Sequence, residues 1–146
     1  MKGTRQVSET ELRNHIDKLA EGVRNKDIAG LKQLYATDIV SFDIEPPLQH
    51  VGRDAKLKNW ANVFAVFEEV TYEVRDLKLT VGEGVAFGHC FARLAGTLKG
   101  GTSTDGMWVR WTFCFREIAG TWLITHDQIS VPLDMPSGQG ATDLEP

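Results

Sequence analysis

The chain has 146 residues, of which 42% are hydrophobic, so it is long enough to bury the core of one domain. Its 20 acidic and 16 basic residues give a net charge of -4 and are scattered along the sequence, which argues against binding to nucleic acid or to an anionic membrane. No apolar run approaches the ~20 residues that a membrane span needs, and the first residues contain no signal peptide, so we expect a soluble, cytoplasmic protein.

Three helices are predicted in the first half of the chain. Ser8-Glu9-Thr10-Glu11 has the pattern of a capping box, and the apolar residues after it keep to one helical face as far as about Arg24. Residues 25–27 end this helix and cap a short second one. A short strand over 39–44 and a Pro-containing loop lead to a third helix from about Asp54, which carries Leu57, Trp60, Ala61 and Phe64 on one face.

Strands dominate the second half of the chain. Four β-rich segments are predicted, over about 71–81, 85–98, 106–117 and 121–131, with Gly-containing connections typical of an antiparallel meander. Because the helices come first and the strands after, we predict an α+β fold in which three N-terminal helices cover one face of a curved antiparallel sheet. Residues 1–132 would form a single domain and residues 133–146 a short polar C-terminal tail.

The last predicted strand changes character halfway along. In "WLITHDQISVP", strict alternation places Trp122, Ile124, His126, Gln128 and Ser130 on one side. The other side then carries Leu123, Thr125, Asp127, Ile129 and Val131. Neither side is uniformly apolar. We therefore interpret this strand as the wall of a pocket that is apolar at its closed end and polar at its opening.

No cofactor is expected. Cys90 and Cys114 each lie in an apolar segment and are predicted to be buried, reduced thiols. The four histidines form no cluster at metal-ligand spacing, and "VGEG" reads as a turn between strands and not as a phosphate-binding loop. We therefore predict neither a metal site nor a nucleotide site.

Two segments carry a resemblance to a known family. The order of elements, "LYATDIVSFD" and the closing "GTWLITHDQISVP" resemble the nuclear transport factor 2-like superfamily, and within it the SnoaL-like and ketosteroid isomerase-like proteins. The resemblance covers residues 10–132. It implies a cone-shaped fold (cystatin-like), a strongly bent sheet wrapped around three helices with a hydrophobic pocket at the open end. Isomerases, cyclases, dehydratases, epoxide hydrolases and binding modules all use this fold, so function has to be argued from the site.

Asp43 is the first candidate catalytic residue. The resemblance to ketosteroid isomerases places it, without a gap, on the aspartate that moves a proton next to a carbonyl. The alternative is that Asp43 begins a solvated turn just before "EPP". The same comparison finds Leu19 where those isomerases have a tyrosine donor, and no acid near Trp111 or Thr112 where they have a second donor. Steroid isomerisation with the usual oxyanion hole is therefore not expected.

The strand over 106–117 offers a second polar set. Trp108, Arg110, Thr112 and Cys114 alternate with wholly apolar residues. One interpretation makes the apolar face the core and points Arg110 to solvent. The other points Arg110 and Thr112 into the pocket, where related epoxide hydrolases have an inward arginine, and leaves the apolar face to an interface.

Several further residues complete the predicted pocket. His126 is the second candidate catalytic residue, because imidazole is the side chain most easily poised near neutral pH. Gln128 shares its face in the alternation. Trp60, Trp108 and Phe42 are predicted as pocket wall or core.

Two functions remain open at this stage. The first is a cofactor-independent acid–base enzyme, of the isomerase, cyclase, hydratase or epoxide-hydrolase type, that acts on a small, mostly apolar carbonyl or cyclic compound. The second is a non-catalytic ligand-binding or dimeric assembly module of the same fold. We expect a homodimer in either case, because an apolar stripe on the 106–117 strand would be exposed if Arg110 faced inward.

Overall fold

The computed structural model describes residues 2–146, and the side chains of residues 7–146. Three helices are present: α1 (Lys2–Arg24), α2 (Ile28–Lys32) and α3 (Arg53–Val66). The expected N-terminal cap of the first helix is wrong, because α1 begins at Lys2 and residues 8–11 lie inside it. The cap of α2 is formed by Asp27, whose side chain accepts a hydrogen bond from the backbone N–H of Gly30.

Six strands form the main sheet. Their bounds are β1 (Tyr35–Phe42), β2 (His50–Val51), β3 (Phe67–Val81), β4 (Val85–Leu98), β5 (Ser103–Ile118) and β6 (Thr121–Ser130), and their order across the sheet is β2-β1-β6-β5-β4-β3. The meander from β3 to β6 is antiparallel, as predicted, but β1 pairs parallel with β6, so the sheet is mixed. Chain order alone did not indicate that the first strand would return beside the last one.

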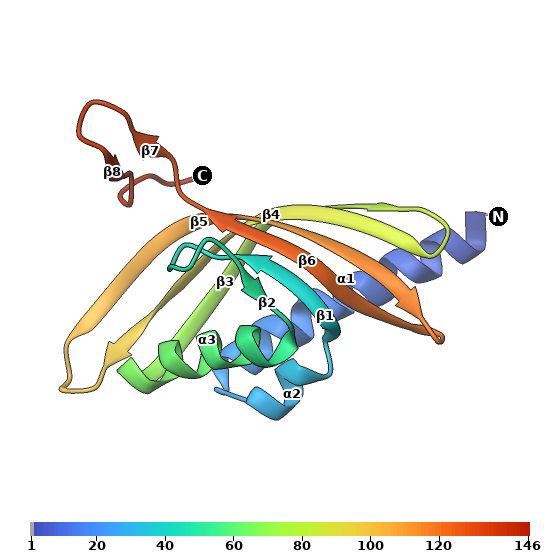
Figure 1. The fold of residues 1–146 in the computed structure, drawn as a ribbon, viewed down its shortest axis with the longest axis horizontal. Helices are drawn as coiled ribbons and strands as arrows, with labels where there is room; N and C mark the ends of the chain where they lie inside the picture. Colours follow the sequence, from blue (N-terminus) through green and yellow to red (C-terminus); the bar gives the residue numbers. More distant parts are fainter. Residues whose placement is uncertain (1) are drawn as a thin grey trace.

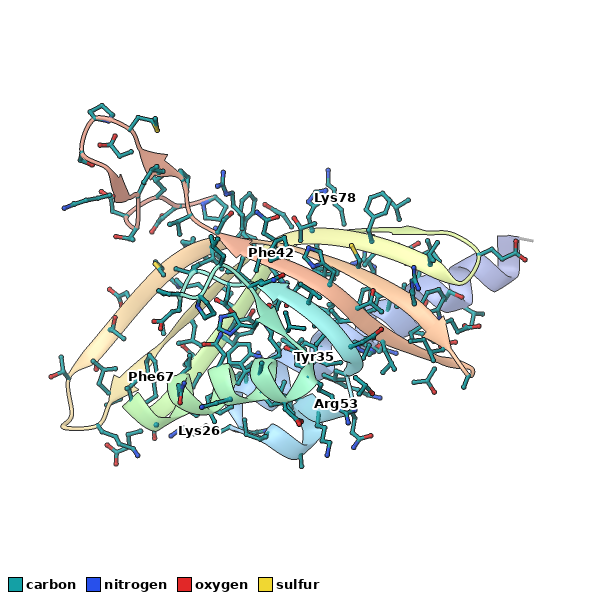
Figure 2. All side chains as sticks on the ribbon, viewed as in Figure 1. Lys26, Tyr35, Phe42, Arg53, Phe67 and Lys78 are labelled. Carbon is teal, nitrogen blue, oxygen red and sulfur yellow. The ribbon has the colours of Figure 1, made fainter. Side chains whose placement is uncertain are left out.

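The sheet bends strongly around the helices. Figure 1 shows β3, β4 and β5 arching over α1 and α3, which gives the cone-like α+β fold predicted from the sequence. The face of the sheet that packs on the helices is called the inner face here, and the opposite face the outer face. The core lies between the inner face and the helices and includes Leu12, Ile16 and Val23 of α1 and Phe113 and Phe115 of β5. Side chains fill this space in Figure 2.

A bulge in β6 decides which of its residues face inward. Cys114 of β5 pairs with His126, whereas the next residue, Phe115, pairs with Ile124, so Thr125 is an extra residue without a partner across the ladder. Trp122 and Ile124 are buried before the bulge, and Asp127 is buried after it. The bulge therefore moves the inward positions from even to odd numbers, which is why neither alternating set looked like a core face.

The C-terminal residues form a small separate hairpin. Strands β7 (Leu133–Asp134) and β8 (Gln139–Gly140) pair antiparallel with each other and stand away from the main sheet in Figure 1. Among the described residues, no helix is both long and apolar enough to cross a membrane.

Candidate functional site

A lysine is buried inside the cone. Lys56 lies one turn before Trp60 on α3, on the side of the helix that faces the sheet, and only 1% of its surface is exposed. Its ammonium nitrogen Nζ lies 3.0 Å from Ser41 Oγ, 3.2 Å from Asp127 Oδ2 and 3.4 Å from Asp43 Oδ2. Three acceptors thus surround the three N–H bonds of the ammonium group.

Asp127 is the buried counter-ion of this lysine. Its carboxylate is 1% exposed, and its second oxygen accepts a short hydrogen bond from the Ser41 hydroxyl. Ser41 and Asp127 are direct partners in the parallel ladder between β1 and β6, so both side chains project from the same face. The register of these two strands therefore brings the serine and the aspartate together, and α3 supplies the cation.

Asp43 is the accessible end of this group. Its side chain is 18% exposed, against 1% for Asp127. One carboxylate oxygen accepts from the backbone N–H of Ile44 at 2.7 Å, and the other accepts from Asn59 Nδ2 at 2.8 Å. The contact with Ile44 is a turn-like contact, whereas the contacts with Asn59 and Lys56 hold the carboxylate against α3.

We call Ser41, Asp43, Lys56, Asn59 and Asp127 the interior cluster. Two carboxylates and one ammonium leave it with a formal charge of -1, so one negative charge is not balanced inside the cluster. Asp43 is the charged member that solvent reaches, and its contact with Lys56 is the longest of the three that the ammonium group makes. Chemically, the cluster can therefore accept a proton at its accessible edge while its buried part keeps a fixed charge.

Aromatic rings enclose the buried ammonium group. Lys56 Nζ lies 5.9 Å from the ring centroids of both Tyr35 and Trp60, at the limit of a cation–π contact. The indole N–H of Trp60 donates to the Tyr35 hydroxyl at 2.9 Å. The apolar surroundings strengthen the electrostatic contacts inside the cluster because they exclude water.

The ionisation of the interior follows from these contacts. Burial alone would lower the pKa of Lys56, but the charge of Asp127, together with Tyr35 and Asp43, outweighs burial and raises the pKa of this lysine above its ordinary value. Burial raises the pKa of the Tyr35 hydroxyl to about 12. Lys56 is thus a permanent cation and Tyr35 a neutral hydroxyl at physiological pH.

A second tyrosine approaches the same interior from β3. Tyr72 packs edge-on against Trp60, with ring centroids 6.4 Å apart. Burial, reinforced by Cys90, Tyr35 and the two aspartates of the interior cluster, raises the pKa of Tyr72 well above its ordinary value. The interior thus contains two tyrosine side chains, Tyr35 from β1 and Tyr72 from β3.

The other predicted site residues lie on the outer face. Asp43 and Trp60 belong to the interior, but six residues predicted to line the pocket do not: Phe42, Trp108, Arg110, Thr112, His126 and Gln128. Phe42 and His126 pack against each other, with ring centroids 4.8 Å apart, and His126 Nδ1 donates to the Val40 carbonyl at 2.6 Å. Thr112 and Gln128 are exposed ladder partners.

The inward placement of Arg110 is wrong. Its guanidinium is exposed, and Nε donates to Ser130 Oγ at 3.1 Å. The inward positions of β5 are the buried aromatic residues Trp111, Phe113 and Phe115. The apolar side of this strand is the core, as the first of the two interpretations had it, because burying three aromatic rings removes far more apolar surface from water than burying one arginine would.

Trp108 lies between two arginines on the outer face. The guanidinium carbons of Arg75 and Arg93 are 4.5 and 5.0 Å from its ring, and both guanidinium groups also contact the Glu73 carboxylate. Trp108 is thus part of a surface charge network and does not belong to the interior wall.

The sequence interpretation missed Lys56, Asp127 and Ser41. For Lys56 a signal existed, since it stands four residues before Trp60 and one before Leu57, on the apolar side of a helix. For Asp127 no local signal existed, because only the bulge at Thr125 turns it inward. For Ser41 the partner was unknown until β1 was placed beside β6.

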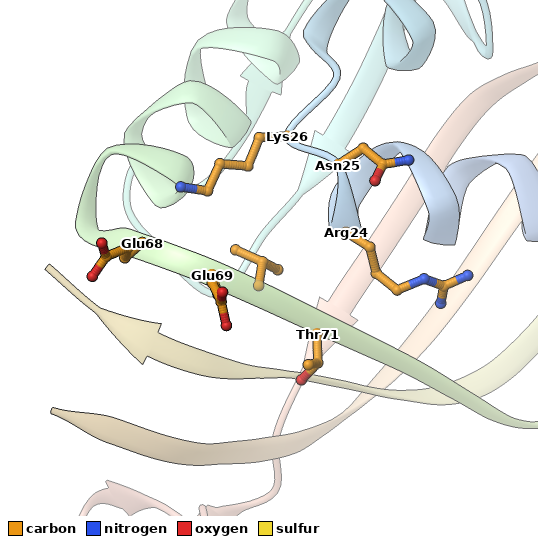
Figure 3. Close-up of a pocket in the computed structure, with 7 residues that line it drawn as sticks. Arg24, Asn25, Lys26, Glu68, Glu69 and Thr71 are labelled. Atoms are coloured by element: carbon orange, nitrogen blue, oxygen red, sulfur yellow. The ribbon is translucent and has the colours of Figure 1, made fainter. Parts of the chain in front are cut away.

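Two cavities lie elsewhere on the surface. One of about 390 Å³ lies between the end of α1 and the loop after it, with Arg24 and Lys26, and the start of β3, with Glu68, Glu69 and Thr71, as Figure 3 shows. The other, of about 350 Å³, lies between α1, α2 and the start of β6, and its wall includes His15 and Trp122. Neither is lined by a member of the interior cluster. Within the described part of the chain, no group of three or more His, Cys, Asp or Glu residues is arranged to hold a metal ion.

Comparisons with known proteins agree with the architecture. The SnoaL-like domain matches residues 12–134. An NTF2-like protein of unknown function from Pseudomonas putida KT2440 superposes with a TM-score of 0.87 at 28% identity, over 97% of this chain and 98% of that one. No curated protein matches the chain.

Two more distant structures are of proteins named for an activity. A candidate dehydratase of the NTF2-like family from Streptomyces avermitilis is 18% identical over 88% of this chain and 99% of its own, with a TM-score of 0.76. A hexachlorocyclohexane dehydrochlorinase from Novosphingobium barchaimii LL02 is 16% identical over 88% of this chain and 89% of its own, with a TM-score of 0.74. At these identities the likeness establishes the fold alone.

Removal of the buried cation is expected to destabilise the protein. Lys56→Met leaves the Asp127 carboxylate buried without its counter-ion, so the free energy of unfolding at pH 7 should fall by about 3–5 kcal/mol. Urea denaturation measures this change. Lys58→Met on the exposed side of α3 is the matched control and should change stability by less than about 0.5 kcal/mol. Adding Asp127→Asn to Lys56→Met should restore part of the loss, and a Lys56→Met protein as stable as the wild type would contradict the assigned ion pair.

Stability should also fall in alkali. Burial raises the pKa of Cys90 from 9.0 to about 12 and that of Tyr35 from 10.0 to about 12, so both groups hold their protons longer in the folded state than in the unfolded state. The contribution of these two groups to the free energy of unfolding is complete below pH 9 and is lost as the pH rises toward 12. Urea denaturation from pH 8 to pH 11 should show this decline. The free energy of unfolding should fall less steeply with pH in the Cys90→Ala variant than in the wild type. An equal slope in the variant would argue against the buried thiol.

Proposed function

Because the chain belongs to the SnoaL-like family of the nuclear transport factor 2-like superfamily, we propose that it is a cofactor-independent acid–base enzyme for a small, mostly apolar carbonyl or cyclic compound. Asp43 is the proposed base. The supporting observation is that Asp43 is the partly exposed carboxylate of a cluster whose other charges, Lys56 and Asp127, are almost fully buried.

The arrangement suits abstraction of a proton from carbon. The C–H bond next to a carbonyl breaks, its proton moves to an Asp43 carboxylate oxygen, and the electron pair moves to the carbonyl oxygen as an enolate, or expels a leaving group from the neighbouring carbon. Asn59 and Lys56 hold the carboxylate in one orientation, which reduces the cost of positioning the base. The fixed charge of Lys56 stays in place when Asp43 becomes neutral.

The activities for which two structural relatives are named are consistent with this class of reaction. Dehydration and dehydrochlorination both remove a proton from carbon and a leaving group from its neighbour. The step that both reactions share is removal of a proton by a base, and for this chain the base would be a carboxylate at the edge of an apolar interior.

The base can be tested without the natural substrate. In D₂O, the protein should accelerate exchange of the protons next to the carbonyl of 1-indanone, followed by proton NMR. Asp43→Asn should lose at least about tenfold of this acceleration, because a neutral amide cannot accept the proton. Asp38→Asn changes an exposed aspartate on β1, the strand that Asp43 follows, and as the matched control it should exchange at the wild-type rate. Exchange that is unchanged in Asp43→Asn would remove the proposed base.

We further propose that the outer face mediates homodimer formation. The stripe first assigned to this role is inside the core, but the outer face carries other exposed rings: Phe87 is 52% exposed and Phe42 is 39% exposed. Exposed aromatic rings grouped on one sheet face are typical of an interaction surface. The charged Arg75–Glu73–Arg93 group on this face would supply polar contacts at the rim.

Light scattering at micromolar concentration tests the dimer. The wild type should have twice the mass of the chain, and Phe87→Asp should shift it to monomer, because a carboxylate would be desolvated in the interface. Leu48→Asp, at an exposed position of the loop between β1 and β2, is the control and should remain dimeric. A monomeric wild type at this concentration would refute the proposal.

A further inference from the structure

The outer face of the sheet gathers positive charge from three neighbouring strands. Direct partners in a ladder project from the same face, so the pairing shows which side chains share this surface. Arg75 on β3 and Arg110 on β5 both pair with Phe91 on β4, and Lys78 and Arg93 occupy the rows on either side of this one. We call the following residues the basic patch: Glu73, Arg75, Lys78, Arg93 and Arg110.

The charge of the basic patch is opposite in sign to that of the whole chain. Four cations and one carboxylate give the patch a formal charge of +3, whereas the net charge of the chain is -4. The cations lie on three strands, so they look scattered in the sequence and come together only through the register of the sheet. Figure 2 shows Lys78 pointing away from the helices, into the space outside the cone.

The C-terminal segment, residues 133–146, carries the complementary charge. It contains Asp134, Asp143 and Glu145 and neither lysine nor arginine, which gives it a formal charge of -3. The last residue of β6 pairs with Arg110, so this segment leaves the sheet directly beside the basic patch. Within the described residues, no carboxylate of the segment forms an ion pair with the patch of its own chain.

The C-terminal segment also exposes apolar side chains. Leu133 is 58% exposed, Met135 79% and Leu144 54%. Its two short strands pair only with each other and add no strand to the main sheet. A hairpin of two-residue strands is marginally stable by itself, and apolar side chains on such a projecting element are typical of a segment that packs against another surface.

The proposed dimer through the outer face needs an acidic group opposite the basic patch. In a two-fold symmetric dimer, the same surface of both copies takes part in the interface. Two patches of charge +3 would then be brought close together, and like charges in an interface oppose association. An acidic segment of the partner, placed over each patch, removes this repulsion.

We propose that the C-terminal segment of one protomer lies on the basic patch of its partner, with its carboxylates against the cations and its apolar side chains against the exposed rings of the outer face. The occupant of this surface is therefore a second copy of the chain. The inference rests on the homodimer proposed above and deepens it, because it names the segment that completes the interface. It does not depend on the proposed acid–base chemistry.

Two charge-reversed variants test this contact. The segment variant carries Asp143→Lys and Glu145→Lys, and the patch variant carries Lys78→Glu and Arg110→Glu. All four positions are exposed, so both variants should keep the fold, which far-UV circular dichroism checks. Each variant alone should dimerise at least about tenfold more weakly than the wild type in sedimentation equilibrium, because like charges then meet at both symmetric contacts.

Mixing the two variants distinguishes a contact between chains from a contact within one chain. In the mixed dimer, each C-terminal segment meets a patch of opposite sign, so the affinity should return to within about threefold of the wild-type value. A contact within one chain cannot be restored in this way. A mixture of the patch variant with wild type measures attraction between the patches alone, and its dimers should be weaker than those of the two variants.

A control variant separates the contact from the effect of net charge. Glu11→Lys with Asp17→Lys makes the same change of charge as the segment variant, at exposed positions of α1. Because α1 lies under the inner face of the sheet, this control should dimerise as tightly as the wild type.

The outcomes separate the inference from the dimer on which it rests. A segment variant that dimerises like the wild type would overturn the inference and leave the outer-face dimer in place, and this comparison decides the question even if the patch variant does not fold. Failure of the mixture to recover affinity would also overturn it. So would binding of single-stranded oligo(dT) by the wild type at physiological salt that the patch variant loses, because the patch would then be open to nucleic acid. A monomeric wild type would refute the dimer and the inference together.

Discussion

The contact between Lys56 and Asp127 is the constraint on which the interior of this protein depends. An ammonium group and a carboxylate that are each 1% exposed are stable together only when every donor and acceptor has a partner. Ser41 and Asp43 supply the remaining acceptors for the lysine, and the Ser41 hydroxyl also donates to Asp127. The group therefore links α3 to β1 and β6, three elements that are distant in sequence, and a shift of any one of them would leave a buried charge unpaired.

The two faces of the sheet differ in the side chains that they carry. The inner face holds the fixed charges, the enclosing rings of Tyr35 and Trp60, and the accessible carboxylate of Asp43. The outer face holds histidine, arginine and tryptophan side chains that contact neighbouring groups of β1, β3 and β6 or solvent. Asp43 and His126, the two catalytic candidates from the sequence, thus lie on opposite faces of the sheet. Only the group on the inner face could act on a molecule held inside the cone.

Much of the fold could be predicted from the sequence. Helical periodicity located the three helices, and β-rich segments between glycines located β3 to β6 and the antiparallel meander. Trp60 was placed with Leu57 and Phe64 on the apolar face of a helix. These features are local, since each depends on residues within about two turns of helix or one strand. Asp43, in contrast, became a candidate through the resemblance to ketosteroid isomerases and not through a local pattern.

Local sequence patterns were enough to predict the order and type of the main elements and the apolar side of the helices. The tertiary structure alone decided the face of His126 and Asp127, because one bulged residue, Thr125, reverses the alternation and no local pattern marks it. It also decided that β1 lies beside β6 and that Lys56 meets Asp127, because these contacts join residues 71 or more positions apart and depend on how the whole sheet closes around the helices. Local propensities specify elements, whereas the partners of a buried charge are specified only when the elements are packed together.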